Sequence, residues 1–188
     1  MITLYGSYTS PYVRHCRMAL LATGTDFRLE ETDYARSSAE SPARRVPYLK
    51  IGDLTLHDSA SILKFIREHS GEDFFADLVD FDLFCLANTV LDTTVNLFLL
   101  ERSGLTVNDS DNLRRQASRI ESGLQHLEQW GWPAQPDWTD GTLRVACLLD
   151  WSQYRDRFSL APYPALHQLL QQARSWSVFQ DTAPPSAS

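Results

Sequence analysis

Residues 6–20 read GSYTSPYVRHCRMAL, a stretch that joins the end of a short apolar strand, a hydroxyl-rich turn and the start of a helix. Apolar residues recur every four positions and predict a helix over residues 11–22. Pro11 suits the first helical position because its missing N–H would have no partner there. Ser10 is then the N-cap. Its hydroxyl either caps the helix alone or also donates a hydrogen bond to an anion at the helix end.

On either side of this stretch the periodicity divides the chain into two halves. The first half predicts strands at residues 2–5, 27–30, 46–51 and 54–57 and a helix at 59–69. After residue 71 only helices are expected, at 77–102, 109–130, 142–157 and from about 165. The segment after Asp33 is short enough to predict only a turn, and the tail TAPPSAS at 182–188 predicts disorder. We expect two domains, an α/β domain at 1–72 and an all-α domain at 77–188.

Composition and charge limit the partners of the chain. The 188 residues, of which 43% are hydrophobic, are enough to bury a core. Residues 1–70 carry a net charge of +1 and residues 71–188 a net charge of −8, which argues against nucleic acid or an anionic membrane as partner. The apolar stretch 78–100 contains three aspartates and predicts a buried helix rather than a membrane span.

The cysteines and the N-terminus predict a cytoplasmic protein without a metal site. Cys16, Cys85 and Cys147 are widely separated and form no C-x-x-C pair. Such a set is more typical of reduced thiols in the cytosol than of a disulfide framework or a zinc site. The N-terminus shows neither a basic segment nor a small-residue cleavage site, so we expect no secretory signal.

Two further motifs lie at predicted element boundaries. In RRVPYL, residues 44–49, Pro47 begins a strand, where proline is tolerated at a sheet edge. A cis Val46–Pro47 bond is the alternative, and it would expose the Val46 N–H and C=O to a ligand's peptide group. In LHDSASIL, residues 56–63, Asp58 and Ser59 precede a helix. They either cap that helix or form a corner in which Ser59 binds a carboxylate and Asp58 an ammonium group.

The order S-P-[FY]-V-R, V-P-x-L, D-S and then an all-α half resembles the glutathione S-transferase superfamily, in particular small bacterial members that begin G-S-Y-T-S-P. The resemblance implies a thioredoxin-like domain followed by a helical bundle, usually as a homodimer. It also implies a detoxifying transferase that uses glutathione as co-substrate to attack small electrophiles. Position by position, the resemblance implies the following site residues: Ser10 for the thiolate with Thr9 as second choice, Val46 beside Pro47 for the cysteinyl backbone, Asp58 and Ser59 for the γ-glutamyl end, and Arg45 for the glycyl carboxylate.

The chain departs from the family pattern at three places, and one of them is the short segment after Asp33, where the family's usual second helix is expected to be reduced to a turn. Where the family has N-P-x-G-K-V-P, residues 41–47 read SPARRVP, so Arg44 replaces a glycine beside the site. The sixth helix usually begins with a Ser/Thr-x-x-Asp capping box, but Thr142 is followed three positions later by Val145. This loss predicts a less firmly fixed helix start.

Two other functions remain open at this stage. One is a non-catalytic binding or regulatory protein that keeps the fold and interacts with another protein. The other uses glutathione as a cofactor in the manner of a maleylacetoacetate isomerase. Because Ser10 stands where a cysteine would imply thiol exchange, glutaredoxin-like activity is not expected.

Overall fold

The computed structural model describes residues 1–185 and divides the chain into two compact units. Unit 1 comprises Met1–Phe74 together with the C-terminal segment from Arg174, and unit 2 comprises Phe75–Ala173. The expected domains 1–72 and 77–188 differ from these units in the placement of the C-terminal segment, and they stay a prediction. Of the tail expected to be disordered, Thr182 is fully buried, whereas residues 186–188 lie outside the described part.

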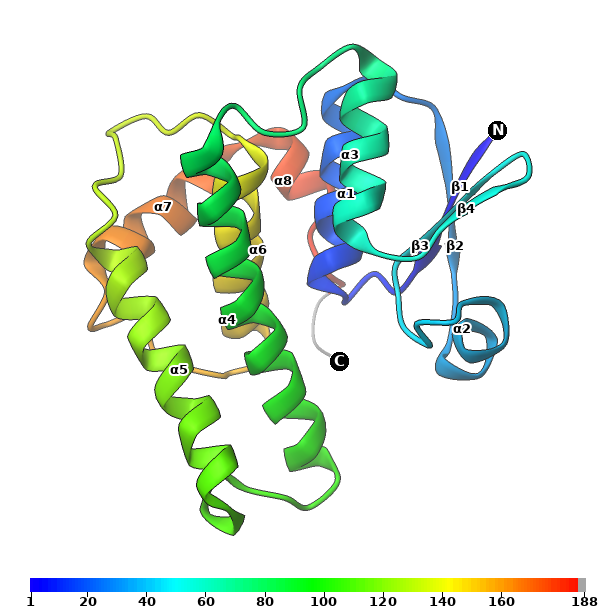
Figure 1. The fold of residues 1–188 in the computed structure, drawn as a ribbon. Helices are drawn as coiled ribbons and strands as arrows, with labels where there is room; N and C mark the ends of the chain where they lie inside the picture. Colours follow the sequence, from blue (N-terminus) through cyan, green and yellow to red (C-terminus); the bar gives the residue numbers. More distant parts are fainter. Residues whose placement is uncertain (186–188) are drawn as a thin grey trace. The chain divides into compact units, whose positions relative to one another are not determined.

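Unit 1 contains a four-stranded sheet in the order β2-β1-β3-β4. The strands are β1 (Ile2–Gly6), β2 (Phe27–Glu31), β3 (Tyr48–Ile51) and β4 (Leu54–Leu56). β1 is parallel to β2 and antiparallel to β3, which is antiparallel to β4. Helices α1 (Pro11–Ala22) and α3 (Ser59–Ser70) lie side by side, whereas α2 (Tyr34–Glu40) lies apart from them (Figure 1).

The core of unit 1 holds α1 close to the end of β1. Leu4, Leu49 and Ile62 are fully buried between the sheet and the two helices. A Cβ atom on Gly6 would lie 2.2 Å from a methyl carbon of Val13, so only glycine permits this approach of strand and helix. This packing fixes where the turn between β1 and α1 lies.

The expected turn after Asp33 was wrong, because α2 is a helix of seven residues. Asp33 caps it by accepting a hydrogen bond from the Arg36 N–H at 2.8 Å. The Glu40 carboxylate pairs with Arg36 at 2.9 Å and with Lys50 of β3 at 2.6 Å. Hydrogen bonds from Lys50 and Arg36 lower the pKa of Glu40 to about 2. A local cap and a link to the sheet therefore stabilise a helix that is short on its own.

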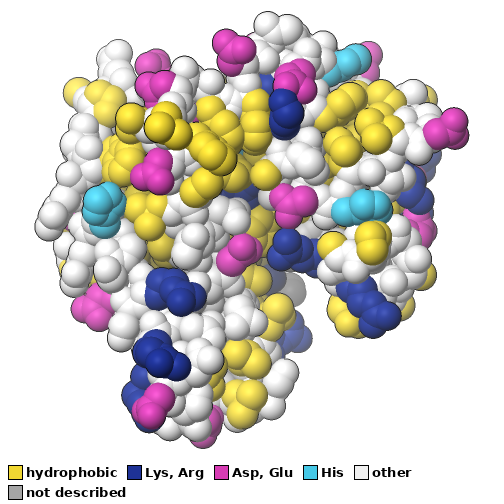
Figure 2. Space-filling view, viewed as in Figure 1, with side chains coloured by type: hydrophobic (Ala, Val, Ile, Leu, Met, Phe, Trp, Pro, Cys, Tyr) yellow, Lys and Arg dark blue, Asp and Glu magenta, His cyan; other side chains and the backbone are white. Residues whose placement is uncertain are grey.

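Unit 2 is helical, with α4 (Leu78–Arg102), a short 3₁₀ helix η1 (Val107–Asp109), α5 (Asp111–Glu128), α6 (Asp140–Tyr154) and α7 (Pro164–Ser175), whose last residues belong to unit 1. Nearly all of α6 is buried, which makes it the centre of the unit. Exposed apolar side chains gather near the start of α4 (Figure 2), where Leu78 is 78% and Val79 61% exposed.

Helix α4 is long and apolar enough to cross a membrane by length and composition alone. A core helix of a soluble protein passes the same test, and 44% of the apolar window in α4 is buried inside the structure. The buried residues include Leu83, Leu91 and Leu97. The interpretation of residues 78–100 as a buried helix therefore holds for part of α4, while other apolar residues of this helix, such as Leu78 and Leu99, are exposed.

The expectation of a weakly fixed start for α6 was wrong. The helix begins at Asp140, with Thr139 as N-cap accepting a hydrogen bond from the Thr142 N–H at 3.2 Å. Asp80 of α4 supplies a second acceptor, since its Oδ1 accepts a hydrogen bond from the Gly141 N–H at 3.1 Å. Burial raises the pKa of Asp80. A carboxylate from another helix thus accepts from one of the free N–H groups at the start of α6 and stabilises it without a capping box.

Candidate functional site

The topology of unit 1 brings the three predicted motifs to one edge of the sheet. Because β1 and β4 are both antiparallel to β3, they run in the same direction and end at the same edge. Strand β3 begins at that edge, since Tyr48 pairs with Tyr5 near the end of β1. The turn at residues 7–10, the Val46–Pro47 bond and the Asp58–Ser59 corner therefore meet there.

The turn before α1 presents hydroxyl groups at a helix N-terminus. Ser10 is half-buried, and its Oγ accepts a hydrogen bond from the Val13 N–H at 3.4 Å. The Ser10 N–H donates to the Ser7 carbonyl at 3.1 Å, which closes the turn. The hydroxyls of Ser7 and Thr9 lie 3.1 Å apart and bond to each other. Capping uses the acceptor side of the Ser10 hydroxyl and leaves its O–H able to donate to an anion.

The Val46–Pro47 peptide bond is cis, which was one of the two alternatives open for this stretch. Pro47 is buried and Val46 is half-buried. Both residues precede Tyr48, the first residue of β3, so they lie outside the strand ladder. Val46 therefore stands at the edge of the sheet where the turn before α1 also ends.

The start of α3 forms the third part of this edge. Asp58 is the N-cap, and its Oδ1 accepts a hydrogen bond from the Ala60 N–H at 2.8 Å. Ser59 is the first helical residue and is buried. The Cys16 thiol lies 4.0 Å from the Ser59 carbonyl oxygen and links α1 to α3. Cys16 is fully buried, so it is a packing residue of α1 and not a thiol of the turn.

Arg45 and Asp58 were expected at opposite ends of a tripeptide, but the structure pairs them. An Arg45 guanidinium nitrogen lies 3.1 Å from Asp58 Oδ2, and the two side chains are 61% and 52% exposed. An ion pair this exposed contributes about 0–1 kcal/mol. A charged ligand can therefore replace either partner at little cost.

Two residues of this region, Ser41 and His57, were not predicted from the sequence. Ser41 Oγ lies 3.2 Å from His57 Nδ1, and this contact ties the end of α2 to the corner before α3. Ser41 is buried, with 2% of its surface exposed. The two residues are far apart in the sequence and carry no shared motif, so no sequence signal could have paired them.

Arg44, which stands where the resemblance implied a glycine, has an unusual backbone conformation. Its φ angle is 50°, in the left-handed region that glycine adopts without steric cost. The Arg44 N–H donates to the Ser41 carbonyl at 2.9 Å and closes a tight turn just before Val46. The turn therefore holds a non-glycine residue in a strained backbone conformation.

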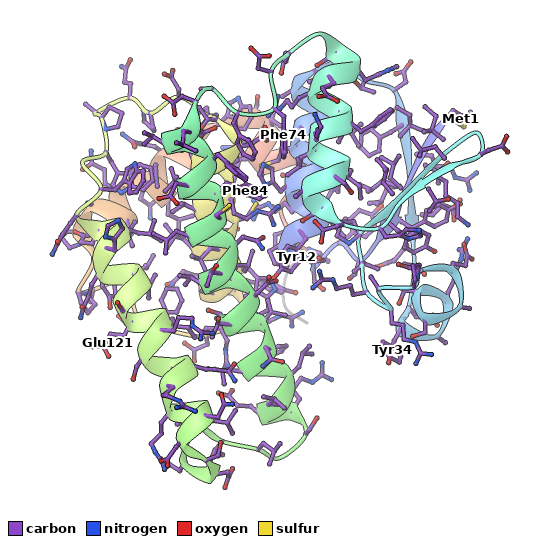
Figure 3. The ribbon with its side chains drawn as sticks, viewed as in Figure 1. Met1, Tyr12, Tyr34, Phe74, Phe84 and Glu121 are labelled. Carbon is purple, nitrogen blue, oxygen red and sulfur yellow. The ribbon has the colours of Figure 1, made fainter. Side chains whose placement is uncertain are left out.

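Aromatic side chains lie at both ends of this region. Tyr12 stands in the first turn of α1, and Tyr34 begins α2 at the far side of unit 1 (Figure 3). Tyr34 is 73% exposed.

A cavity of about 500 Å³ in the same unit, lined in part by Met1, Gly24 and His69, lies at the opposite edge of the sheet. Within residues 1–185 no group of three or more His, Cys, Asp or Glu side chains is arranged to hold a metal ion.

Comparison with known proteins bears on the fold of the chain and on the family of its N-terminal part. Residues 4–73 match the sequence family described as "Glutathione S-transferase, N-terminal domain". A solved glutathione transferase family member from Pseudomonas fluorescens Pf-5, with bound glutathione, superposes with a TM-score of 0.88 over 98% of this chain and 100% of that one, at 22% identity. The chain has the glutathione S-transferase fold. The expected thioredoxin-like domain followed by helices is thereby confirmed.

Other relatives agree with the same fold. A glutathione S-transferase from Methylobacillus flagellatus KT, solved with glutathione bound, has a TM-score of 0.86 at 23% identity and covers 98% of this chain and 100% of its own. Glutathione S-transferase 4 of Zea mays is 34% identical in an alignment of 79 residues that covers 38% of this chain. The match spans only 35% of the maize protein's length. Together these likenesses show a glutathione S-transferase-like sequence over residues 4–73 and the same fold over nearly the whole chain.

Proposed function

We propose that the chain is a glutathione transferase that binds glutathione along the edge formed by the turn 7–10, Val46 and the Asp58–Ser59 corner. The convergence of these three stretches at one sheet edge is the observation that carries the proposal. The match of residues 4–73 to the N-terminal family and the glutathione present in the two bacterial relatives support the choice of ligand.

The three stretches suit the three parts of the tripeptide. The Ser10 hydroxyl at the start of α1 can donate to the sulfur, and the positive helix end favours its anionic form. Val46, outside the ladder, can pair through its backbone with the cysteinyl residue. The N-terminus of α3 with Ser59 can hold the γ-glutamyl carboxylate, and Asp58 can accept from its ammonium group.

Binding also gives Arg45 a role. If the ligand's ammonium group replaces Arg45 on Asp58, the guanidinium is released for the glycyl carboxylate, which it can bind with two parallel hydrogen bonds. Thr9 remains the second-choice hydroxyl for the sulfur, because its own hydroxyl already bonds to Ser7.

The chemistry is a nucleophilic attack. The bound thiol loses its proton to solvent, and the thiolate forms a sulfur–carbon bond with an electrophile. The electrophile either releases a leaving group with its bonding electron pair, or moves the electron pair of its own π bond to a neighbouring atom that then takes up a proton. A hydrogen bond from Ser10 to the thiolate, worth about 1.5–3 kcal/mol, would lower the thiol pKa by about one to two units. The rate gain then comes from a larger thiolate fraction and from holding the two reactants together.

Thermal unfolding with and without millimolar glutathione tests the binding step. We expect glutathione to raise the melting temperature of the wild-type chain, because it binds only the folded state. Asp58→Asn should reduce this shift by removing the partner of the ammonium group. Asp53→Asn, in the exposed turn between β3 and β4, is the matched control and should leave the shift unchanged. A wild-type chain without any shift would rule the proposal out.

Conjugation of glutathione to generic electrophiles tests turnover. Stabilisation by glutathione without conjugation would favour the alternative, a binding protein that keeps the site but not the reaction.

We also propose that the protein is a cytoplasmic homodimer and takes part in detoxification. Sedimentation of the purified chain tests whether the dimer forms.

A further inference from the structure

Two buried arginines of α1 hold the end of the C-terminal helix α8 (Ser177–Asp181), which lies beside α1 within unit 1 (Figure 1). Arg14 donates to the Phe179 carbonyl at 2.9 Å. Arg17 donates to the carbonyls of Thr182 at 3.1 Å and Asp181 at 3.3 Å. Carbonyls in the last turn of a helix lack a backbone N–H partner within it, and the two guanidinium groups donate to them. The Thr182 hydroxyl also donates to the Phe179 carbonyl, at 3.1 Å.

The arrangement concentrates positive charge in the interior of unit 1. Arg14 and Arg17 are only 4% and 9% exposed. Burial lowers the pKa of Arg17, and the charge of Arg14 lowers it further. Aromatic faces offset part of this cost, since the Arg14 guanidinium lies 3.8 Å from the ring centre of Phe179. A buried cation is tolerated only while such partners stay in place.

Arg17 also reaches the turn that carries Ser10. Its guanidinium lies 5.0 Å from the ring centre of Tyr8, which is within the range of a cation–π interaction. Tyr8 stands two residues before Ser10 and is 37% exposed. One side chain thus contacts both the end of α8 and the hydroxyl-rich turn, which are more than 160 residues apart in the sequence.

We propose that Arg17 is a positioning residue, which holds Tyr8 and the turn 7–10 in place by anchoring them to the C-terminal segment Phe179–Thr182. Arg14 secures the same segment through Phe179. The C-terminal segment is then a support of the candidate site rather than a tail. This inference deepens the proposed function, because the turn that it fixes is the one that presents Ser10 to the glutathione sulfur.

Amide hydrogen exchange of the free protein tests this link without any ligand. In Arg17→Met we expect the amides of Thr9 and Ser10, and those of residues 181–183, to exchange about 10-fold faster, which corresponds to a loss of about 1.4 kcal/mol in the free energy of local opening at 25 °C. Arg17→Lys keeps the charge and should give a smaller increase. Arg28→Met, which removes an exposed arginine paired with Glu30 on β2, is the matched control and should change neither segment.

Tyr8→Leu tests the link from the other side with a half-exposed residue whose replacement leaves the core intact. Because coupling is reciprocal, loss of the ring should speed exchange at residues 181–183. If Arg17→Met speeds amide exchange at residues 181–183 but leaves the exchange rates in the turn 7–10 unchanged, the proposal is overturned, because Arg17 would then anchor only α8. A uniform increase over β1 and β3 would also overturn it, because it would indicate general destabilisation.

Kinetics separate this inference from the proposed function. If the wild-type chain conjugates glutathione, Arg17→Met should lower kcat, with partial recovery in Arg17→Lys. If the wild-type chain does not bind glutathione, the proposed function fails while the exchange measurements still decide whether Arg17 positions the turn.

Discussion

Replacing Ser10 by alanine separates the two roles that this hydroxyl can have. As an N-cap it accepts from the Val13 N–H at 3.4 Å, which is long for a hydrogen bond. The loss of the cap should therefore cost about 0.5–1 kcal/mol. For a chain of this size, about 1 kcal/mol lowers the melting temperature by roughly 2–4 °C.

The chain offers a matched control in Ser110, the N-cap of α5. Ser110 Oγ accepts from the Leu113 N–H at 3.2 Å, so Ser110→Ala removes the same kind of cap in unit 2. Both variants should lose similar stability in thermal or urea unfolding. Only Ser10→Ala should change the chemistry of bound glutathione.

The deciding assay is a titration of the bound thiol, followed by the ultraviolet absorbance of the thiolate. In Ser10→Ala the pKa of this thiol should rise by about one to two units, because a charge-assisted hydrogen bond of about 1.5–3 kcal/mol is lost. Ser110→Ala should titrate like the wild type. If Ser10→Ala also titrates like the wild type, Ser10 is only a helix cap and the reasoning is refuted.

Three further predictions concern stability. Arg44→Gly should raise the free energy of unfolding, measured in urea, by up to about 1 kcal/mol, because glycine adopts the left-handed backbone without strain. Ala43→Gly is the control and should lower the free energy of unfolding. An equal decrease in both variants would contradict this prediction. The pKa of Glu40 is lowered to about 2, so the stabilisation by its ion pairs is present above the ordinary pKa near 4.5 and is lost as the pH falls toward 2. Glu40→Gln should therefore have a lower free energy of unfolding than the wild type at neutral pH, and this free energy should fall less steeply as the pH is lowered. If its pH dependence is the same as that of the wild type, these ion pairs do not stabilise the fold. In Gly123→Ala a new Cβ would lie 2.3 Å from a methyl carbon of Val90, so we expect a loss of about 1–3 kcal/mol from overpacking, offset in part by helix propensity; a double-mutant cycle with Val90→Ala should show coupling.

The sequence predicts those parts of the fold that local patterns determine. Helix α1 runs over Pro11–Ala22 as expected, because its cap, its N-terminal proline and its apolar spacing all lie within a few residues. The order of strands and helices in the first half follows from equally local signals. The motifs at Ser10, Val46 and Asp58 could be proposed as one site only through the family resemblance, and the sheet topology then placed them at one edge.

The misses share a physical cause, which is a partner distant in the sequence. Helix α2 has a local cap in Asp33, and the ion pair of Glu40 with Lys50 on β3 stabilises it further. The start of α6 is fixed by Asp80 from α4, and Thr182 is buried because Arg17 binds its carbonyl. None of these distant partners lies within the window of a local pattern. A sequence read alone therefore underestimates how firmly such segments are held.

The most direct test of the central claim is a crystal structure of the chain with glutathione. The account predicts the sulfur beside Ser10 Oγ, the cysteinyl backbone paired with Val46, and the γ-glutamyl end at Asp58 and Ser59. It also predicts that the Arg45–Asp58 ion pair is broken. Glutathione bound at another surface, such as the cavity near Met1 and His69, with this sheet edge left empty, would contradict it.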